Sequence, residues 1–474
     1  MTTKRLGRLV ATLFPICVGA LRQTPPSMKG LLILVMLFWS STSFAQTEIQ
    51  PSQINGTVAL KNAVADAALY VSTAGKDSND GLSPGSAKAT LPGALSACPS
   101  PGAVCWIRFG AGTFTGTAEL PVAASNVQSI RITGINTQRG APNGGVAGGT
   151  VFRNRTTSTP TITIAPNTSG VTIENIYFTS STLSSTTPHI LVNAGTGSGI
   201  ASELYIQGNY FNAGGYGVQV IENGAGSAFE VMMLHNQFGS QTTDCIHMTS
   251  NVQGQVSQIT IHDNRCQLFG ANGIYSTNGS GMLIDDNQIT ANASSSGSNI
   301  YINAGGGAAT TISNNLLEAL PSASGTNYAM DLKGNSFTIT NNEIFNTYNA
   351  ISCTCSYSTI GTNNFGYTAT TTGWDITLTS SSTGNLIGPQ NGTYPNGYFK
   401  DNSGTLTNQM FNIDGNGTDQ LGVLLLNGYT FSTLPGSPTN GMVLYCNNCT
   451  IANPCASGGN GAIAKRLNGV WVCN

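Results

Sequence analysis

The sequence predicts an all-β fold, a right-handed parallel β-helix in which the chain winds through stacked coils. A short pattern recurs: a β-branched or aliphatic residue, two polar residues, Asn, any residue and an apolar residue. The repeats lie about 27 residues apart, which is a period typical of solenoids. Gly, Asn and Ser are abundant between the repeats and helix-forming residues are sparse, so the repeats are expected to hold strands and turns.

The repeated Asn marks one corner of each coil. It can adopt the left-handed backbone that a corner needs, and Asn side chains stacked at the ~4.8 Å strand spacing can form an amide ladder. The repeat positions are Asn175 (with a one-residue slip), Asn209, Asn236, Asn264, Asn287, Asn315, Asn342 and Asn363. A second regular strand is expected around Val218, Ile246, Ile274, Ile300 and Ile351.

The amino-terminal segment 1–45 has the features of an export signal. Met28-Lys29-Gly30 precedes the apolar run Leu31–Trp39, and Ser43-Phe44-Ala45 provides small residues for cleavage after Ala45. Either Met1 or Met28 can be the start. The apolar run is shorter than the roughly 20 residues that span a bilayer, although a retained anchor is the alternative. We therefore expect no membrane span in the mature chain and a secreted, extracellular or cell-surface location.

The remaining chain divides by composition and repeats. We expect a linker at 46–68, the β-helix at 69–400, a connecting segment at 401–428 and a small Cys-rich β module at 429–474. Within this module, Asn468-Gly469 predicts a hairpin turn near the carboxyl end.

Cysteines fall in local sets, which in an exported chain favours disulfides. We expect disulfides between Cys98 and Cys105 and among the carboxy-terminal four, Cys446, Cys449, Cys455 and Cys473. Zinc binding by these four is an alternative that an oxidising compartment disfavours. A Cys353–Cys355 pair is left open, because one intervening residue would strain it.

Charge excludes one class of partner. Charged residues make up 8% of the chain, the formal net charge is −2, and no basic stripe is present to follow a phosphate backbone. We expect no nucleic-acid partner.

The amino-terminal part of the predicted solenoid resembles a known family. Leu69–Ser72, Gly75–Pro84, Ala94–Ala97 and Trp106–Phe114 are similar to the opening of bacterial secreted proteins of the pectin-lyase-like superfamily. The resemblance covers roughly residues 69–400 and implies a parallel β-helix whose first coil is closed by a short helix. Pro92, following Thr90, is well placed to begin that helix. The tail is similar to terminal modules that follow β-helices in secreted and phage-tail-like proteins.

Aligning the repeats brings His and Asp side chains into columns along the solenoid. The position before the repeat Asn holds a His and then two Asp residues in successive coils, and the adjacent column repeats this chemistry. A His beside a carboxylate can act as a general base or hold a cation in place. The candidate site comprises His235, Asp263, Asp286, His262, Asp285, Asp244, His247 and Arg265.

A structural reading of the same residues stays open, because Asp and Asn are ordinary corner residues. The polygalacturonase-like motif set is missing, and no basic residue stands in a pectate-lyase-like motif. Calcium is a possible cofactor, with Asp263, Asp286, Asp77 and Asp80 as weak candidates. The loop Asp77–Gly81 is one residue short of the EF-hand spacing, so a structural turn is its alternative.

These observations favour a secreted or cell-surface β-helix that binds carbohydrate, with a polysaccharide or a cell-surface glycan as partner. One alternative is a polysaccharide lyase or glycoside hydrolase acting on an acidic polysaccharide. Another is a non-catalytic adhesin-like or tail-spike-like structural protein. A homotrimer is a possible assembly.

Overall fold

The structure is a computed structural model of the chain. It describes residues 67–474 except 99–102, 121–126, 136–148, 196–198, 292–294, 306–308, 320–327, 348, 367–374, 392–398, 404–407, 411–427 and 437–439. The predicted export signal and nearly all of the predicted linker lie outside the described residues. Among the described residues, no helix is long and apolar enough to cross a membrane.

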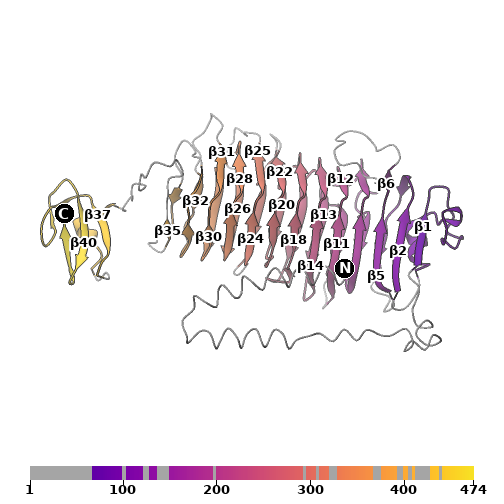
Figure 1. Cartoon of the computed structure of the whole chain (residues 1–474), viewed down its shortest axis with the longest axis horizontal. Helices are drawn as coiled ribbons and strands as arrows, with labels where there is room; N and C mark the ends of the chain where they lie inside the picture. The colour runs from indigo at the N-terminus through magenta and orange to yellow at the C-terminus, as the bar shows by residue number, and fades with distance from the viewer. Residues whose placement is uncertain are drawn as a thin grey trace, which may run out of the picture. The chain divides into compact units, whose positions relative to one another are not determined.

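Three parallel sheets form the solenoid, and each complete coil of its central part contributes a strand to all three (Figure 1). Sheet A contains β1 (Ala67–Val71), β2 (Ala103–Phe109), β5 (Val127–Thr133), β8 (Thr168–Glu174), β11 (Ile200–Gln207), β14 (Ser227–Leu234), β17 (Val256–Ser257), β18 (Thr260–His262), β21 (Leu283–Asp285), β24 (Thr310–Ser313), β27 (Phe337–Thr340), β30 (Thr359–Ile360), β33 (Leu386–Ile387) and β35 (Gln409–Met410).

Sheet B follows sheet A along each coil. It contains β3 (Gly112–Thr115), β6 (Thr150–Asn154), β9 (Tyr177–Ser180), β12 (Tyr210–Asn212), β15 (Gln237–Gly239), β19 (Arg265–Gln267), β22 (Gln288–Ala291), β25 (Leu316–Ala319), β28 (Glu343–Phe345) and β31 (Asn364–Gly366).

Sheet C completes the coil. It contains β4 (Ala118–Leu120), β7 (Ile162–Ile164), β10 (Pro188–Asn193), β13 (Tyr216–Glu222), β16 (Asp244–Ser250), β20 (Ile274–Thr277), β23 (Ile300–Asn303), β26 (Tyr328–Asn335), β29 (Asn349–Ser356), β32 (Ile376–Leu378) and β34 (Phe399–Asp401). Since β34 and β35 pair with earlier coils, the solenoid sheets continue to Met410, past the expected boundary at residue 400.

The core consists of in-register columns of apolar side chains inside the coils. On sheet A, Ile261, Ile284 and Ile312 are fully buried and occupy one column. On sheet B, Phe178, Phe211 and Phe238 stack with ring centroids about 5 Å apart. The second strand expected from the sequence is sheet C, where Val218, Ile246, Ile274 and Ile300 lie in register. The fold class is therefore confirmed.

The amide ladder is confirmed, but the backbone role predicted for its Asn residues is wrong. Nδ2 of each ladder Asn donates to Oδ1 of the next, from Asn209 at 3.2 Å through to Asn363, which donates to Gln390 at 3.1 Å. The left-handed backbone belongs to the preceding residue, as at His235, Asp263 and Asn341. Because the preceding residue makes the corner, the side chain of the ladder Asn can point into the interior of the coil, where it is buried.

The first repeat also differs from the prediction. Ile173 and Ile206 pair in register without a slip, so Ile176, not Asn175, occupies the ladder position. Asn175 is instead the left-handed corner residue, with φ of 59°.

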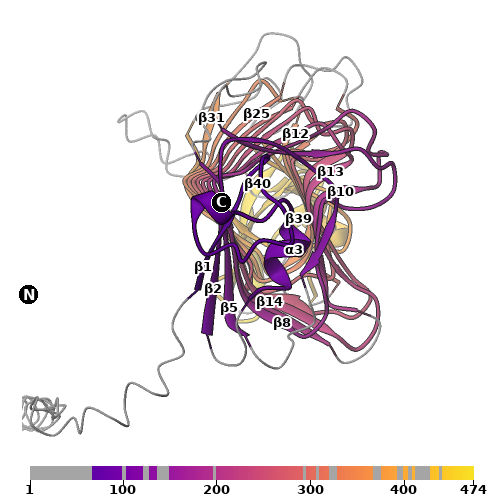
Figure 2. The same cartoon turned by 90° about the vertical axis from the view of Figure 1, so that its right-hand side faces the viewer.

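A single helical turn closes the first coil. Helix α3 (Leu91–Leu95) begins after Thr90, whose side chain accepts a hydrogen bond from Gly93 N, and Pro92 lies in its first turn. Leu91 and Ala94 are buried in the solenoid core, and α3 lies across the end of the coils (Figure 2). The expected capping helix is confirmed. A short 3-10 turn, η2 (Pro84–Ser86), precedes it.

Five disulfides form among the described residues. Cys98 pairs with Cys105 as predicted, and Cys446–Cys449 and Cys455–Cys473 account for the carboxy-terminal four. The zinc alternative thereby loses its ligands. Cys245–Cys266 links sheets C and B, and Cys353 pairs with Cys355 within β29. Such a set is typical of proteins that fold in an oxidising compartment.

The tail is a separate small β module with its own core of Leu444, Cys446, Ala464, Trp471 and Cys473, among others. Its strands are β36 (Gly428–Tyr429), β37 (Val443–Cys446), β40 (Ala462–Leu467), β41 (Val470–Cys473), β38 (Cys449–Thr450) and β39 (Ala456–Ser457), with a 3-10 turn η3 (Phe431–Thr433). The hairpin expected at Asn468-Gly469 is present, with positive φ at both turn residues.

Candidate functional site

The corner between sheets A and B carries a pocket of about 270 Å³ on the outside of the solenoid. Residues from three consecutive coils line it. They are His235, Asn236, Gln237, Asp263, Asn264, Arg265, Asp286 and Gln288. Four of the predicted site residues, His235, Asp263, Asp286 and Arg265, therefore lie together as the repeat alignment anticipated.

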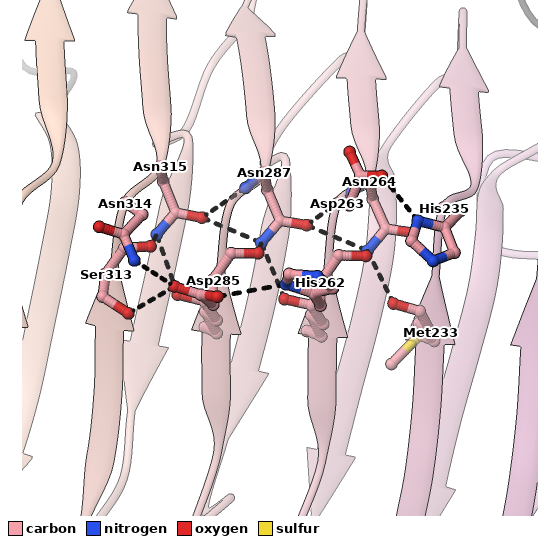
Figure 3. Close-up of polar contacts among 12 residues, drawn as sticks. Met233, His235, His262, Asp263, Asn264, Asp285, Asn287, Ser313, Asn314 and Asn315 are labelled. Carbon is pink, nitrogen blue, oxygen red and sulfur yellow. Dashed lines mark hydrogen bonds and ion pairs between the residues drawn. The ribbon is translucent and has the colours of Figure 1, made fainter. Parts of the chain in front are cut away.

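The left-handed corner residues supply the imidazole and the two carboxylates of the pocket. His235, Asp263 and Asp286 have φ of 55°, 49° and 56°, while the following Asn turns into the ladder. His235 Nδ1 lies 2.6 Å from Asp263 Oδ2, across one coil step (Figure 3). Both side chains are nearly half exposed. When a carboxylate accepts a hydrogen bond from the Nδ1–H of a neutral imidazole, Nε2 is the nitrogen that carries the lone pair and can accept a proton.

A second His–Asp pair lies beside the first, at the end of sheet A. His262 Nδ1 is 3.2 Å from Asp285 Oδ2, and the rings of His235 and His262 meet edge to face. Asp285 Oδ1 accepts hydrogen bonds from Ser313 Oγ at 2.7 Å and Asn314 Nδ2 at 2.8 Å (Figure 3).

Asp285 is held as a carboxylate by these partners. Partial burial opposes ionisation, but the hydrogen bonds from Ser313 and Asn314 and the nearby His262 outweigh it and lower the pKa of the Asp285 carboxyl. Because both of its oxygens are already engaged, Asp285 orients its neighbours and has little capacity left for a ligand.

Arg265 and Asp286 are the charges available to a ligand. Both are exposed. In the part of the chain that the structure describes, the Arg265 guanidinium has no ion-pair partner and the Asp286 carboxylate accepts no hydrogen bond. Gln237 and Gln288 flank Arg265 in register on sheet B.

Asp244 and His247 do not belong to this pocket, contrary to the prediction. Both lie on β16 in sheet C, whereas the pocket is at the corner between sheets A and B. His247 Nδ1 is 2.6 Å from Asp244 Oδ2, and Asp244 is buried, with Oδ1 accepting from Asn272 N and Nδ2. The sequence places both residues on the second regular strand of the coil, around Ile246, and that strand is sheet C, away from the corner that carries the pocket.

The His247 ring belongs to an aromatic stack on sheet C. It lies between Tyr216 and Tyr275, at centroid distances of 4.3 and 4.6 Å, and Tyr301 follows at 5.0 Å. The Lys333 ammonium covers Tyr301 at 4.9 Å. Burial, with Asp244 nearby, raises the pKa of the Tyr216 hydroxyl. The facing sides of these stacked rings contact each other, so the main role of the stack is to pack the surface of sheet C.

Gln237 and Gln288 line the pocket but were not among the residues predicted for the site. They occupy the unrestricted position of the repeat, directly after the ladder Asn, so the pattern itself gives them no weight. Written as a column, this position reads Tyr210, Gln237, Arg265 and Gln288, which is a polar strip with Arg265 near its centre.

The Asp77–Gly81 loop is a structural turn. Asp77 Oδ1 accepts from the backbone N of Ala89 and Thr90 at 3.0 Å each, and Asp80 Oδ1 accepts from Leu82 N and Ser86 Oγ. Among the described residues, no group of three or more His, Cys, Asp or Glu side chains is arranged to hold a metal ion. Calcium binding stays a prediction.

No protein-family model and no curated protein matches the chain. Solved structures with a similar fold include the Dettilon tailspike protein, at 14% identity and a TM-score of 0.37, covering 63% of this chain and 57% of that one. A GH136 lacto-N-biosidase from Eubacterium ramulus matches at 11% identity and a TM-score of 0.41, covering 73% and 68%.

The A-module of the Azotobacter vinelandii mannuronan C-5 epimerase AlgE6 matches at 10% identity and a TM-score of 0.40, covering 68% of this chain and 93% of that one. This chain spans less than two thirds of the length of the Dettilon tailspike. Three stacked parallel sheets and an internal amide ladder define the fold of the chain as a right-handed parallel β-helix.

Proposed function

We propose that this protein is a secreted or cell-surface carbohydrate-binding β-helix, and that the pocket at the corner of sheets A and B binds the glycan. One observation carries the proposal. An exposed guanidinium, an exposed carboxylate, two amides and a His–Asp pair converge from three coils on one pocket. Sugar hydroxyls need such mixed donors and acceptors.

Each group has a definite task in this proposal. Arg265 donates to a carboxylate or hydroxyl of the sugar, since a guanidinium presents several donors in a fixed geometry. Asp286 accepts from sugar hydroxyls. Gln237 and Gln288 do both, because an amide carries a donor and an acceptor.

The experiment is a polysaccharide and glycan-array screen of the mature chain, followed by calorimetry with Arg265→Ala and Asp286→Asn. Charge-assisted hydrogen bonds contribute roughly 1.5–3 kcal/mol, so each variant should weaken binding about tenfold or more. Asn also suits a left-handed corner, so Asp286→Asn should retain the melting temperature of the wild type. Unchanged affinity in both variants would place the glycan elsewhere.

Catalysis on an acidic polysaccharide is the second candidate, and the His235–Asp263 pair favours it. A His oriented by a carboxylate, 2.6 Å away, is the arrangement of a general base. Release of reducing ends or unsaturated products from alginate or polygalacturonate, lost in His235→Gln, supports an enzyme. Binding without product supports a lectin-like role.

A homotrimer belongs to the same proposal. Val443, Tyr445 and Ile463 are exposed on the face of the tail sheet opposite its own core. An apolar face on so small a module is a candidate assembly surface.

A further inference from the structure

We propose that the pocket is the centre of a longer strip on sheet B, and that this strip takes an internal segment of a linear glycan of about five sugars, one per coil, lying along the solenoid axis. The inference rests on the proposed function and goes further, because it assigns the shape and length of the ligand.

The strip is a single in-register column on the outer surface of sheet B. It consists of Tyr210, Gln237, Arg265, Gln288 and Leu316, from β12, β15, β19, β22 and β25. The same column continues to Tyr177, which is buried, on one side and to Glu343, which is exposed and acidic, on the other, and these two residues bound the strip. All five side chains are half-buried or exposed. Parallel strands in register place them one strand spacing, ~4.8 Å, apart.

The chemistry of the strip changes from its centre to its ends. Gln237, Arg265 and Gln288 line the pocket and can hydrogen-bond to hydroxyls. Tyr210 and Leu316 flank them with apolar surface, which suits the CH face of a sugar ring. A polar centre with apolar ends matches a chain that continues past the pocket on both sides.

Tyr210 is held in place before any ligand arrives. Its ring stacks on Tyr177 at 5.0 Å with an interplanar angle of 12°, and Tyr177 Oη accepts a hydrogen bond from Asn212 Nδ2 at 3.1 Å. A fixed ring loses little conformational entropy on binding. Tyr210 and Arg265 lie on either side of Gln237 in the same register of sheet B, so the two belong to one surface.

The repeat of the strip suits a linear chain better than a single terminal sugar. An extended glycan advances per sugar by about one strand spacing, so each sugar meets the equivalent position of the next coil. A site that binds the end of a glycan chain needs residues that block the strip on one side of the pocket. Here the same column of side chains continues on both sides of the pocket.

The test is calorimetry with two defined ladders, oligogalacturonates and cello-oligosaccharides, each from the disaccharide to the octasaccharide. We expect affinity to rise to about the pentasaccharide and then to level off. Tyr210→Ala should weaken binding of the hexasaccharide about fivefold to tenfold but leave the disaccharide unchanged. Tyr210→Phe, which keeps the ring, should bind like the wild type.

The matched control is Tyr357→Ala, which removes a tyrosine that is 72% exposed at a corner of a later coil; it should bind both lengths normally. Equal affinity for all lengths, or a loss in Tyr210→Ala that does not depend on length, would overturn the strip while leaving the pocket intact. Failure of both ladders to bind the wild type would count against the proposed function as well.

Discussion

His189 is the histidine that the fold buries completely, and its chemistry differs from that of the other three. Its Nε2 lies 3.1 Å from the carbonyl oxygen of Ala213, its Nδ1 is 3.4 Å from Thr161 Oγ1, and its ring rests between Phe178 and Phe211. Burial lowers the pKa of the imidazole to about 4, although hydrogen bonds to two carbonyls oppose the shift. His189 is therefore neutral and structural.

This burial predicts a loss of stability in acid. The ordinary pKa of 6.5 applies to the unfolded chain, so between pH 6.5 and about 4 the unfolded state binds the proton that the folded state refuses. Stability is fully present above pH 6.5 and falls as the pH drops through this window, by about 3 kcal/mol in total. Urea unfolding at pH 7 and pH 4.5 should reveal the loss, and His189→Gln should reduce it. An identical pH dependence in the variant would contradict the assignment to His189.

Sequence reasoning reached some site residues and not others for a physical reason. A repeat alignment shows which residues occupy the same position in successive coils, so His235, Asp263 and Asp286 were brought together correctly. The same alignment gives the order of the strands along a coil but not the distances between side chains on different sheets. Asp244 and His247 lie on β16 in sheet C of the same turn, whereas the pocket lies at the corner between sheets A and B.

At the level of the strand corners, two adjacent asparagines illustrate why residue type alone is ambiguous. Asn341 is exposed with φ of 56°, while Asn342 is fully buried in the ladder. Asn suits a left-handed backbone and an amide ladder equally well. The position of the ladder could be predicted from the sequence, but the division of these two tasks needed the backbone path.

The ladder should contribute strongly to stability. Asn342 Oδ1 accepts from Asn315 N and Nδ2 at 3.0 and 2.9 Å, and its Nδ2 donates to Asn363 Oδ1 and to the Ile312 carbonyl at 3.0 Å each. Asn342→Ala leaves buried partners without hydrogen bonds and should cost ~2–4 kcal/mol of unfolding free energy.

The adjacent residue provides the control in chemical denaturation. Asn341→Gly keeps a residue that tolerates the left-handed backbone, so it should change stability by less than about 0.5 kcal/mol. If both variants unfold at the same urea concentration, the hydrogen bonds of the ladder do not contribute the predicted stability.

At the scale of the whole chain, stability is local, because each coil packs chiefly against its neighbours and the tail has its own core. The Cys455–Cys473 disulfide ties the last strand β41 into that small core. Replacing both cysteines with Ser should remove about 3 kcal/mol from the tail module and leave the solenoid unaffected. Limited proteolysis should then cleave within residues 429–474 first; new cleavage within the coils would show that the two parts are coupled.

The proposed trimer is tested on the tail sheet. Tyr445 and Ile463 are cross-strand partners, exposed by 37% and 48%, beside Val443 at 46%. If this face joins copies of the chain by a closed rotational arrangement, light scattering after size-exclusion chromatography should give three copies for the wild type and one for Ile463→Glu. Ile451→Glu is the control, because Ile451 is 76% exposed but lies outside the four-stranded sheet. A wild-type chain that elutes as a monomer, or an Ile463→Glu variant that stays trimeric, would remove this face from the assembly.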